Sequence, residues 1–259
     1  MKNTNKIKFL GTAGARFVVM KQVRSSGGMW LTLDNTNVLV DPGPGSLVRC
    51  LSSKPKLNPM DLDGIILTHR HLDHSNDVNI MIEAMTNGGF KKKGTIFAPS
   101  DAFDNDPVIL KYFRDHVEKI EVLKEKGSYN LENISFSTPI KHIHGVETYG
   151  LNIRGKNHSI SIITDTEYFE NLESHYPGQI LIINIVLLER RDIIKHLCLN
   201  DAEKIISKNK PKLSILTHFG MTMIKAKPWE IAENLTNKLG VKVIAARDGL
   251  ELDIDQYKN

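Results

Sequence analysis

The stretch ILTHRHLDHSND, residues 66–77, places three histidines and one aspartate within six consecutive positions. These residues are His69, His71, Asp73 and His74, and they follow closely on the apolar run GIIL. Two interpretations compete: a dense polar loop at the surface, or the first half of a metal site. Packing gives no reason to gather imidazoles and a carboxylate at the end of a strand, because both are uncommon in cores. The stretch therefore predicts metal binding.

The spacing within this stretch suggests a centre for two metal ions. In an extended segment, residues two apart point to the same side, so His69 and His71 can hold one cation. Asp73 and His74 can then turn toward a second cation about 3.5–4 Å away. Donors from one short loop are too few to complete two coordination shells. More His and Asp residues are therefore expected at the ends of other strands.

Further donors do follow other apolar runs. The run SIIT leads into Asp165 and the run LSIL leads toward His218, while His144 lies in HIHGVETYG. Loops at strand ends, held by a rigid sheet, are where α/β proteins build their sites. His142 has the same strand parity as His144, so periodicity cannot choose between these two histidines.

The rest of the chain combines short strands with helices. Its 259 residues with 41% hydrophobic content are enough for a substantial core. No linker or low-complexity tract is visible, so residues 1–259 are expected to form a single α/β domain with two similar halves that meet near residue 140. The β-branched runs predict strands at 7–11, 37–41, 64–68, 95–99, 134–138, 159–164, 180–184, 213–217 and 241–245. Helical patterns occupy 76–87, 107–116, 200–209 and 228–239, and Asn200 with Glu203 resembles a capping box.

Composition narrows the setting in which the protein works. The formal net charge of +4 slightly favours anionic partners but does not establish nucleic-acid binding. Cys50 and Cys198 lie far apart without metal-type spacing, which fits a reducing compartment. The start of the chain shows neither a secretory signal nor a membrane span. A cytoplasmic protein without membrane association is therefore expected, and a homodimer is left open.

The motif THRHLDH matches the HxHxDH signature of the metallo-β-lactamase superfamily, and the later His, Asp and His follow in that family's order. FLGTAGAR resembles the family's opening strand and glycine turn, NVLVDPGPGS its LIDxGxG segment, and ARDGLEL its closing strand pair. The resemblance covers nearly the whole chain. It implies an αβ/βα four-layer sandwich with two mixed sheets and the metals at one edge of the sheets.

The resemblance also implies a role for each donor, with a His shortly before a Tyr-Gly pair selecting His144 over His142. The implied ligands are His69, His71 and His144 for one ion, Asp73, His74 and His218 for the other, and Asp165 as a bridge that water or hydroxide completes. Imidazole and carboxylate without thiolate suit two divalent ions, zinc first, with manganese or iron as alternatives. Asp41, in DPGPGS, is expected to organise its loop and not to bind metal.

The substrate must be indicated by residues outside the metal shell, because one fold hosts many activities. His196 lies twenty-two positions before His218 and just ahead of a predicted helix, similar to a histidine of ribonuclease Z. The resemblance implies a phosphodiesterase in which His196 protonates the leaving oxygen and Asp73 orients the nucleophile. A thioester or lactone hydrolase of the glyoxalase II type is the alternative. A redox or purely metal-binding protein is a third, which His71 and His196 both argue against.

The interval between His144 and Asp165 limits the comparison with ribonuclease Z. Only twenty residues separate the two, where ribonuclease Z carries a long arm that grips tRNA. This chain has room there for a β-hairpin and nothing more. Small, cyclic or short phosphodiesters, including short nucleic-acid ends, therefore fit better than precursor tRNA.

Overall fold

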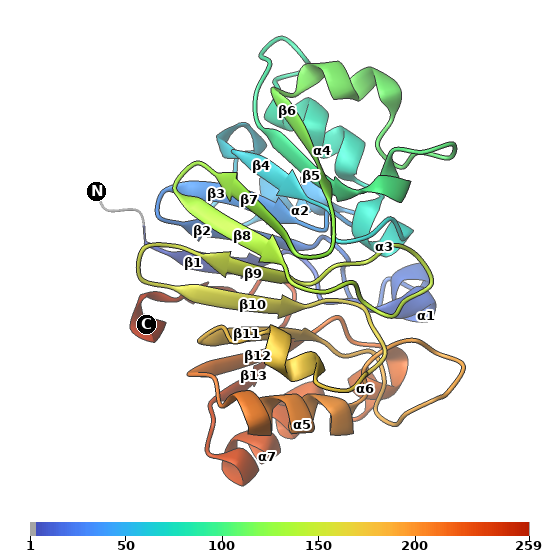
Figure 1. Ribbon diagram of the computed structural model, residues 1–259, viewed down its shortest axis with the longest axis vertical. Coiled ribbons are helices and arrows are strands. Elements are labelled where there is room, and N and C mark those ends of the chain that lie inside the picture. Colours follow the sequence, from blue (N-terminus) through green and yellow to red (C-terminus); the bar gives the residue numbers. More distant parts are fainter. Residues whose placement is uncertain (1–3, 259) are drawn as a thin grey trace.

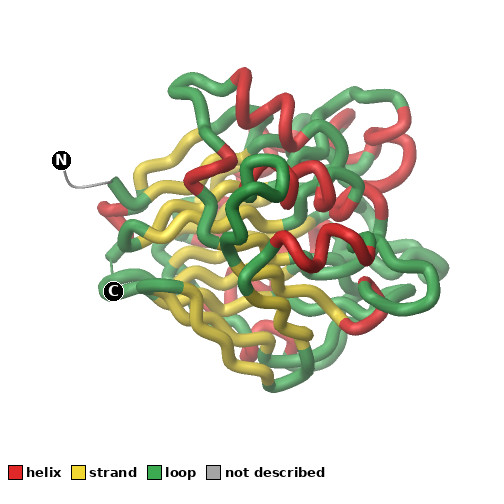
Figure 2. Tube along the Cα trace, turned by 90° about the horizontal axis from the view of Figure 1, so that it is seen from above, coloured by secondary structure: helices red, strands yellow, loops and turns green. Residues whose placement is uncertain are grey.

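The computed structural model describes residues 4–258 and shows two β-sheets packed face to face with helices outside them (Figures 1 and 2). The first sheet contains, in spatial order, β14 (Glu251–Asp253), β1 (Lys6–Phe9), β2 (Met29–Leu33), β3 (Thr36–Val40), β4 (Gly64–Ile66), β5 (Thr95–Pro99) and β6 (Lys119–Leu123). The second contains β13 (Val243–Ala245), β12 (Leu213–Thr217), β11 (Ile180–Asn184), β10 (Ser159–Ile163), β9 (Leu151–Arg154), β8 (Ile134–Thr138) and β7 (Gly127–Leu131).

Both sheets are mixed, as the sequence predicts. Strands β3 to β6 are parallel to one another, and so are β10 to β13. The remaining neighbours pair antiparallel, including β14 with β1 and β9 with β10. Because the carboxyl ends of parallel strands meet at one edge of a sheet, the segments that follow β3, β4, β10 and β12 gather at one end of the molecule.

Helices form the two outer layers (Figure 1). The first sheet is covered by α2 (Ser46–Ser52) and α4 (Val78–Met85), and the second by α5 (Leu199–Asn209) and α7 (Pro228–Leu239). Three shorter helices lie at the end where the parallel strands terminate: α1 (Ala15–Met20), α3 (Leu72–Ser75) and α6 (Met221–Lys225). The 3₁₀ turns are η1 (Pro59–Asp61), η2 (Ser100–Ala102), η3 (Lys111–His116), η4 (Leu172–His175) and η5 (Asp255–Tyr257). Among residues 4–258 no helix has the length and apolar character to cross a bilayer.

The largest stabilising contribution comes from apolar side chains between the layers. Phe97 of β5 meets Phe136 of β8 edge-on, with ring centroids 4.9 Å apart, so the inner faces of the two sheets share one core. Helix α4 buries Val78, Met81, Ile82 and Met85, the spacing of a single helical face, against the first sheet. Each such side chain contributes roughly 1.5–3 kcal/mol on burial.

The nine predicted strand ranges all contain a strand, whereas two predictions about the helices are wrong. The predicted helix at 107–116 begins with a bend at residues 108–109 and has only the 3₁₀ helix η3, Lys111–His116, at its end. Helix α5 has its N-cap at Cys198, whose backbone N–H donates to Asp201 Oδ2 at 3.0 Å, so Asn200 and Glu203 do not form the capping box. The helices expected at 76–87 and 228–239 are α4 and α7.

The boundary between the halves also differs from the prediction. Strand β6 belongs to the first sheet and β7 to the second, so the chain changes sheet at residues 124–126 and not near 140. Strand β7 escaped recognition because Ser128 and Asn130 alternate with its apolar residues and lie exposed. Helices α5 and α7 pack over β11 to β13, which leaves the outer face of β7 to β9 to such polar side chains (Figure 1).

Candidate metal centre

The predicted donors lie at the end of the molecule where the parallel strands terminate. Asp41 follows β3 directly, Asp165 follows β10 by one residue, and His218 follows β12 directly. The HxHxDH segment follows β4, and its second part forms the short helix α3, a helical turn that the sequence argument did not specify. His71 caps helix α3, so Asp73 and His74 lie on a helical turn that directs them away from His71.

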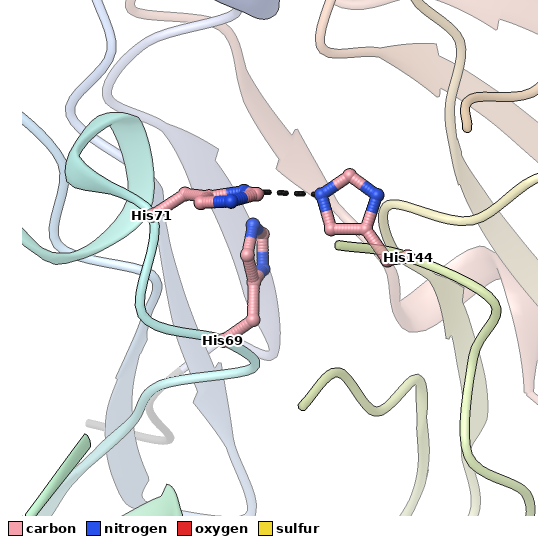
Figure 3. Close-up of side chains that lie close together, drawn as sticks. All are labelled: His69, His71 and His144. Carbon is pink, nitrogen blue, oxygen red and sulfur yellow. Dashed lines mark hydrogen bonds between the residues drawn. The ribbon is translucent and has the colours of Figure 1, made fainter. Parts of the chain in front are cut away.

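Three histidines from two loops converge on one point (Figure 3). His71 Nδ1 lies 3.0 Å from His144 Nε2. The ring of His69 points toward the gap between them, with its centroid 4.9 Å from that of His71 and 5.2 Å from that of His144. Their ligand atoms are close enough together for one ion to contact all three.

A second group of donors lies beside the first. His74 Nε2 is 3.3 Å from His218 Nε2, and Asp73 Oδ2 lies 3.8 Å from the former nitrogen and 3.6 Å from the latter. These three residues come from helix α3 and from the loop after β12. The structure therefore brings together the set that the resemblance assigns to the second ion.

Asp165 stands between the two groups. Its Oδ2 lies 3.8 Å from His144 Nε2 and 3.5 Å from His74 Nε2. Its Oδ1 lies 3.4 Å from His218 Nε2 and accepts a hydrogen bond of 2.9 Å from Asn184 Nδ2. Burial alone would raise the pKa of this carboxyl, but the surrounding imidazoles, that of His218 first, hold the pKa well below its ordinary value. A buried, ionised carboxylate thus faces both groups of histidines.

The donor set fits divalent metal ions. His69 is fully buried, and its Nε2 has no hydrogen-bond partner among the residues that the structure describes. A buried polar atom without a partner is costly, and here it faces other imidazoles and a carboxylate. Burial also holds the pKa of His69 well below its ordinary value, so its ring is neutral and has a lone pair to offer. Imidazole nitrogen and carboxylate oxygen suit several first-row metals.

The outward-facing nitrogens of the histidines are held by neighbouring groups. Asp41 Oδ2 lies 2.9 Å from His74 Nδ1 and accepts from Thr68 Oγ1, while its Oδ1 accepts from Thr68 N, both at 2.7 Å. The Nδ1 of His144 lies 3.0 Å from the carbonyl oxygen of Lys195. Such partners fix the tautomer and the orientation of a ligating ring. Asp41 thus has the loop-organising position that its sequence context predicts.

The loop after β12 is also held in an unusual conformation. His218 has φ +60°, in the left-handed region that non-glycine residues rarely adopt. Gly14 packs against it so closely that a Cβ atom on Gly14 would lie 2.1 Å from the His218 carbonyl oxygen. Position 14 of the GTAG turn therefore requires a glycine. Close packing against the loop of His218, and not phosphate binding, accounts for this residue.

His142 does not join the donors. Its Nε2 is 2.5 Å from the hydroxyl of Tyr176 and its Nδ1 is 3.2 Å from the backbone oxygen of Asp165. Burial lowers the pKa of His142 to about 4, so the ring is neutral. It accepts from Tyr176 and donates to the Asp165 carbonyl, and so supports the segment that carries the bridging candidate. Asn184 was missed by the sequence analysis, although it too ends an apolar strand, ILIIN.

His196 reaches the same site from the loop before α5. Its Nδ1 lies 3.6 Å from Asp165 Oδ2, and its ring centroid is 5.0 Å from that of His144. The side chain is 16% exposed, so it stands where the site opens to solvent. The sequence-based choice of His196 thus identified a residue of the site. The distance to Asp165 allows a role beside the metals as well as a role as a ligand.

The position of Asp41 leads to a first prediction. We expect Asp41→Asn to weaken metal binding by about 10–100-fold, the usual cost of losing an outer partner of a ligand, because the amide cannot serve both His74 and Thr68 as the carboxylate does. Competition with a chromophoric chelator measures the affinity, and Glu233→Gln on the exposed face of α7 is the matched control. Unchanged affinity in Asp41→Asn would contradict the role.

Comparisons with known proteins relate nearly the whole chain to described families and folds. The family described as "Beta-lactamase superfamily domain" matches residues 36–219. An uncharacterised protein of Methanocaldococcus jannaschii is 32% identical over 259 aligned positions, which cover 96% of this chain and 94% of the relative. Ribonuclease Z of Kineococcus radiotolerans is 32% identical over 109 residues, which are 42% of this chain and 33% of that enzyme. The crystal structure of the metallo-β-lactamase fold protein YhfI from Bacillus subtilis matches with a TM-score of 0.78 at 19% identity, covering 96% of this chain and 99% of that one.

Proposed function

Because the chain belongs to the beta-lactamase superfamily, we propose that it is a dinuclear metal-dependent phosphodiesterase. The observation that carries this proposal is the position of one buried carboxylate, Asp165, between two groups of histidines, with His196 beside it. Two groups of donors around a shared carboxylate suit a pair of ions. An additional imidazole at the mouth of the site suits a reaction whose leaving group needs a proton.

The proposed ligands divide as the geometry groups them. His69, His71 and His144 would hold one ion, Asp73, His74 and His218 the other, and Asp165 both. Zinc is the first candidate, since imidazole and carboxylate without thiolate suit it, and manganese and iron are the alternatives. When bound, the ions supply an acidified water as nucleophile and neutralise charge on the phosphoryl oxygens.

The chain's own residues carry out the remaining tasks. Asp73, at the edge of the second group, orients the attacking water and accepts a hydrogen bond from it. His196 holds a proton for the departing alkoxide, which would otherwise be a very poor leaving group. Burial lowers the pKa of His196, an effect that the neighbouring Asp165 opposes. A bound phosphodiester adds a second negative charge next to this ring and so favours its protonated form.

The substrate that this site suits best is small. Between His144 and Asp165 the structure has the antiparallel pair β9 and β10, joined by residues 155–158. No long arm projects there to hold a folded RNA. The similarity to ribonuclease Z supports phosphodiester chemistry, and the short hairpin supports small or cyclic diesters and short nucleic-acid ends. We place the protein in the cytoplasm, where Cys50 and Cys198, both free thiols, stay reduced.

A substrate panel tests the proposal. The metal-loaded protein should hydrolyse bis(p-nitrophenyl) phosphate and short dinucleotides faster than thioesters and lactones, because two ions around a shared carboxylate suit the charged phosphoryl oxygens of a diester. A precursor tRNA should be cleaved more slowly than the small diesters. Initial rates with equal protein and metal content are the measurement.

Two outcomes would oppose the proposal. Faster turnover of thioesters or lactones than of any diester would favour the glyoxalase II-like alternative. Efficient cleavage of the tRNA precursor at its 3′ end, above the rate on small diesters, would refute the restriction to small substrates. Mere binding of tRNA would not count, because it is sequence-independent and sensitive to salt.

A further inference from the structure

A second cavity of about 570 Å³ lies away from the candidate metal centre. It is formed by the end of β9, the turn into β10, the segment before β11, and Lys212. The turn between β9 and β10 lies on the left in Figure 1, whereas α1, α3 and α6, which mark the metal centre, lie on the right. Strand β10 begins at this cavity and leads to Asp165 at its other end. The cavity is therefore not part of the site described above.

The wall of the cavity is positively charged. Arg154 and Lys212 both line it, and the twelve lining residues include no Asp or Glu. The side chain of Arg154 is exposed and has no ion-pair or hydrogen-bond partner among residues 4–258, while its backbone pairs with Ser159 and Ser135 in the sheet. Lys212 donates to the carbonyl oxygen of Lys258, which positions its ammonium group without neutralising the charge. Two cationic residues thus line the same space, and a carboxylate, Asp255, lies beside it, with its Oδ1 3.7 Å from Nε2 of the lining residue His158.

Hydrogen bonds within the protein hold several polar groups of the cavity wall in place. Ser161 Oγ donates to Asn152 Oδ1 at 2.6 Å and accepts from the backbone N–H of Gly178 at 2.8 Å, which fixes the floor between β9 and β10. His158 is 1% exposed, and its Nδ1 has no hydrogen-bond partner within the described part of the chain. Gln179 adds a side-chain amide. The cavity wall thus combines internally hydrogen-bonded polar groups with one buried imidazole nitrogen that has no partner among the described residues.

We propose that this cavity binds a small molecule through a phosphate or carboxylate group. Its volume lies in the range of ligand pockets, roughly 300–1,000 Å³. The guanidinium of Arg154 offers parallel N–H donors that match the oxygens of either group, and such charge-assisted bonds are stronger than neutral ones. A cationic ligand would be repelled by Arg154 and Lys212, and a purely apolar one would leave both charges desolvated.

Calorimetric titration of the metal-loaded protein tests the proposal. The probes are inorganic phosphate, adenosine monophosphate and citrate, and the variants are Arg154→Gln and Lys212→Gln. Lys156→Gln is the control, since Lys156 is exposed on the same turn but does not line the cavity. Anions can also bind at the metal centre, so the same probes are measured as inhibitors of hydrolysis. Circular dichroism confirms that each variant folds.

The expected result is a binding event in the wild-type protein and in Lys156→Gln that inhibition does not account for. Arg154→Gln and Lys212→Gln should each weaken it by roughly tenfold or more and leave the inhibition constants unchanged. Stronger binding of adenosine monophosphate or phosphate than of citrate would identify a phosphate site, and the reverse a carboxylate site. No binding beyond inhibition, or binding equally tight in both variants, would overturn the proposal.

Discussion

Asp165→Ala is expected to lose both bound metal and hydrolysis, with turnover falling by at least about 10³-fold, more than the roughly 10–100-fold cost of losing an outer partner. Asp165 lies within 3.4–3.9 Å of five histidine nitrogens, so its removal takes away the oxygen ligand that we propose both groups of donors share. His69→Ala should act in the same direction through the first group. Metal content by elemental analysis and turnover of a diester, measured on the same sample, check both.

Removal of metal from the wild-type protein should reproduce this loss. Dialysis against a chelator should abolish turnover, because the attacking water is activated by the ions that the ligands hold. Two equivalents of zinc, manganese or iron per chain should restore it. Glu233→Ala on α7 serves as the control for handling. A wild-type protein without metal after purification in metal-replete medium, or full activity after chelation, would refute the dinuclear proposal.

His196→Ala is expected to separate proton donation from metal binding. Both ions should remain bound, while turnover of an alkyl phosphodiester falls by roughly 10²–10⁴, the usual loss for a missing general acid. The loss should be much smaller with a p-nitrophenyl diester, because p-nitrophenolate is stable without a proton. Turnover of the two diesters by the same variant is the measurement, and misfolding would lower both rates equally.

The structure also defines what would contradict this role. His196 Nδ1 is 3.6 Å from Asp165, which is near enough for His196 to serve as a ligand instead. Loss of metal in His196→Ala, or equal losses on both diesters, would assign it to the ligands or to the scaffold. Lys195→Ala is the matched control, since it keeps the backbone carbonyl that His144 contacts.

The apolar runs of the sequence, such as ILIIN in β11 and LSILT in β12, predicted most of the buried strands, whereas the metallo-β-lactamase-type αβ/βα sandwich followed from the resemblance carried by the HxHxDH motif. The strands that these runs did not predict are of two kinds. Strand β2 is preceded by two glycines, which obscure its start, while β6 and β7 carry polar residues on an exposed face. Strand β9 was expected only as part of the hairpin between His144 and Asp165, and β14 only from the resemblance of ARDGLEL. Whether a strand face is exposed depends on which helices cover it. This is a property of the tertiary structure, and the local sequence pattern of a strand does not contain it.

The same distinction applies to the site. The donors could be found because polar residues at the ends of apolar strands stand out, and the structure brings all of them together. The choice between His142 and His144 depends on Tyr176, which is far away in sequence and holds His142 in the core. The helical turn at Asp73 and His74 was not foreseen, because four residues are too few to show a helical period.

The pairing of β1 with β14 has a consequence for how the chain folds. Lys6 is opposite Asp253, so the first strand described is completed by the last. Contacts between residues so distant in sequence form slowly, because the intervening chain must lose its freedom before they can form. During synthesis β1 keeps an open hydrogen-bonding edge until residues 251–253 have emerged, and open edges invite aggregation. Folding yield should therefore depend more on the rate of synthesis than it would in a fold built from local contacts.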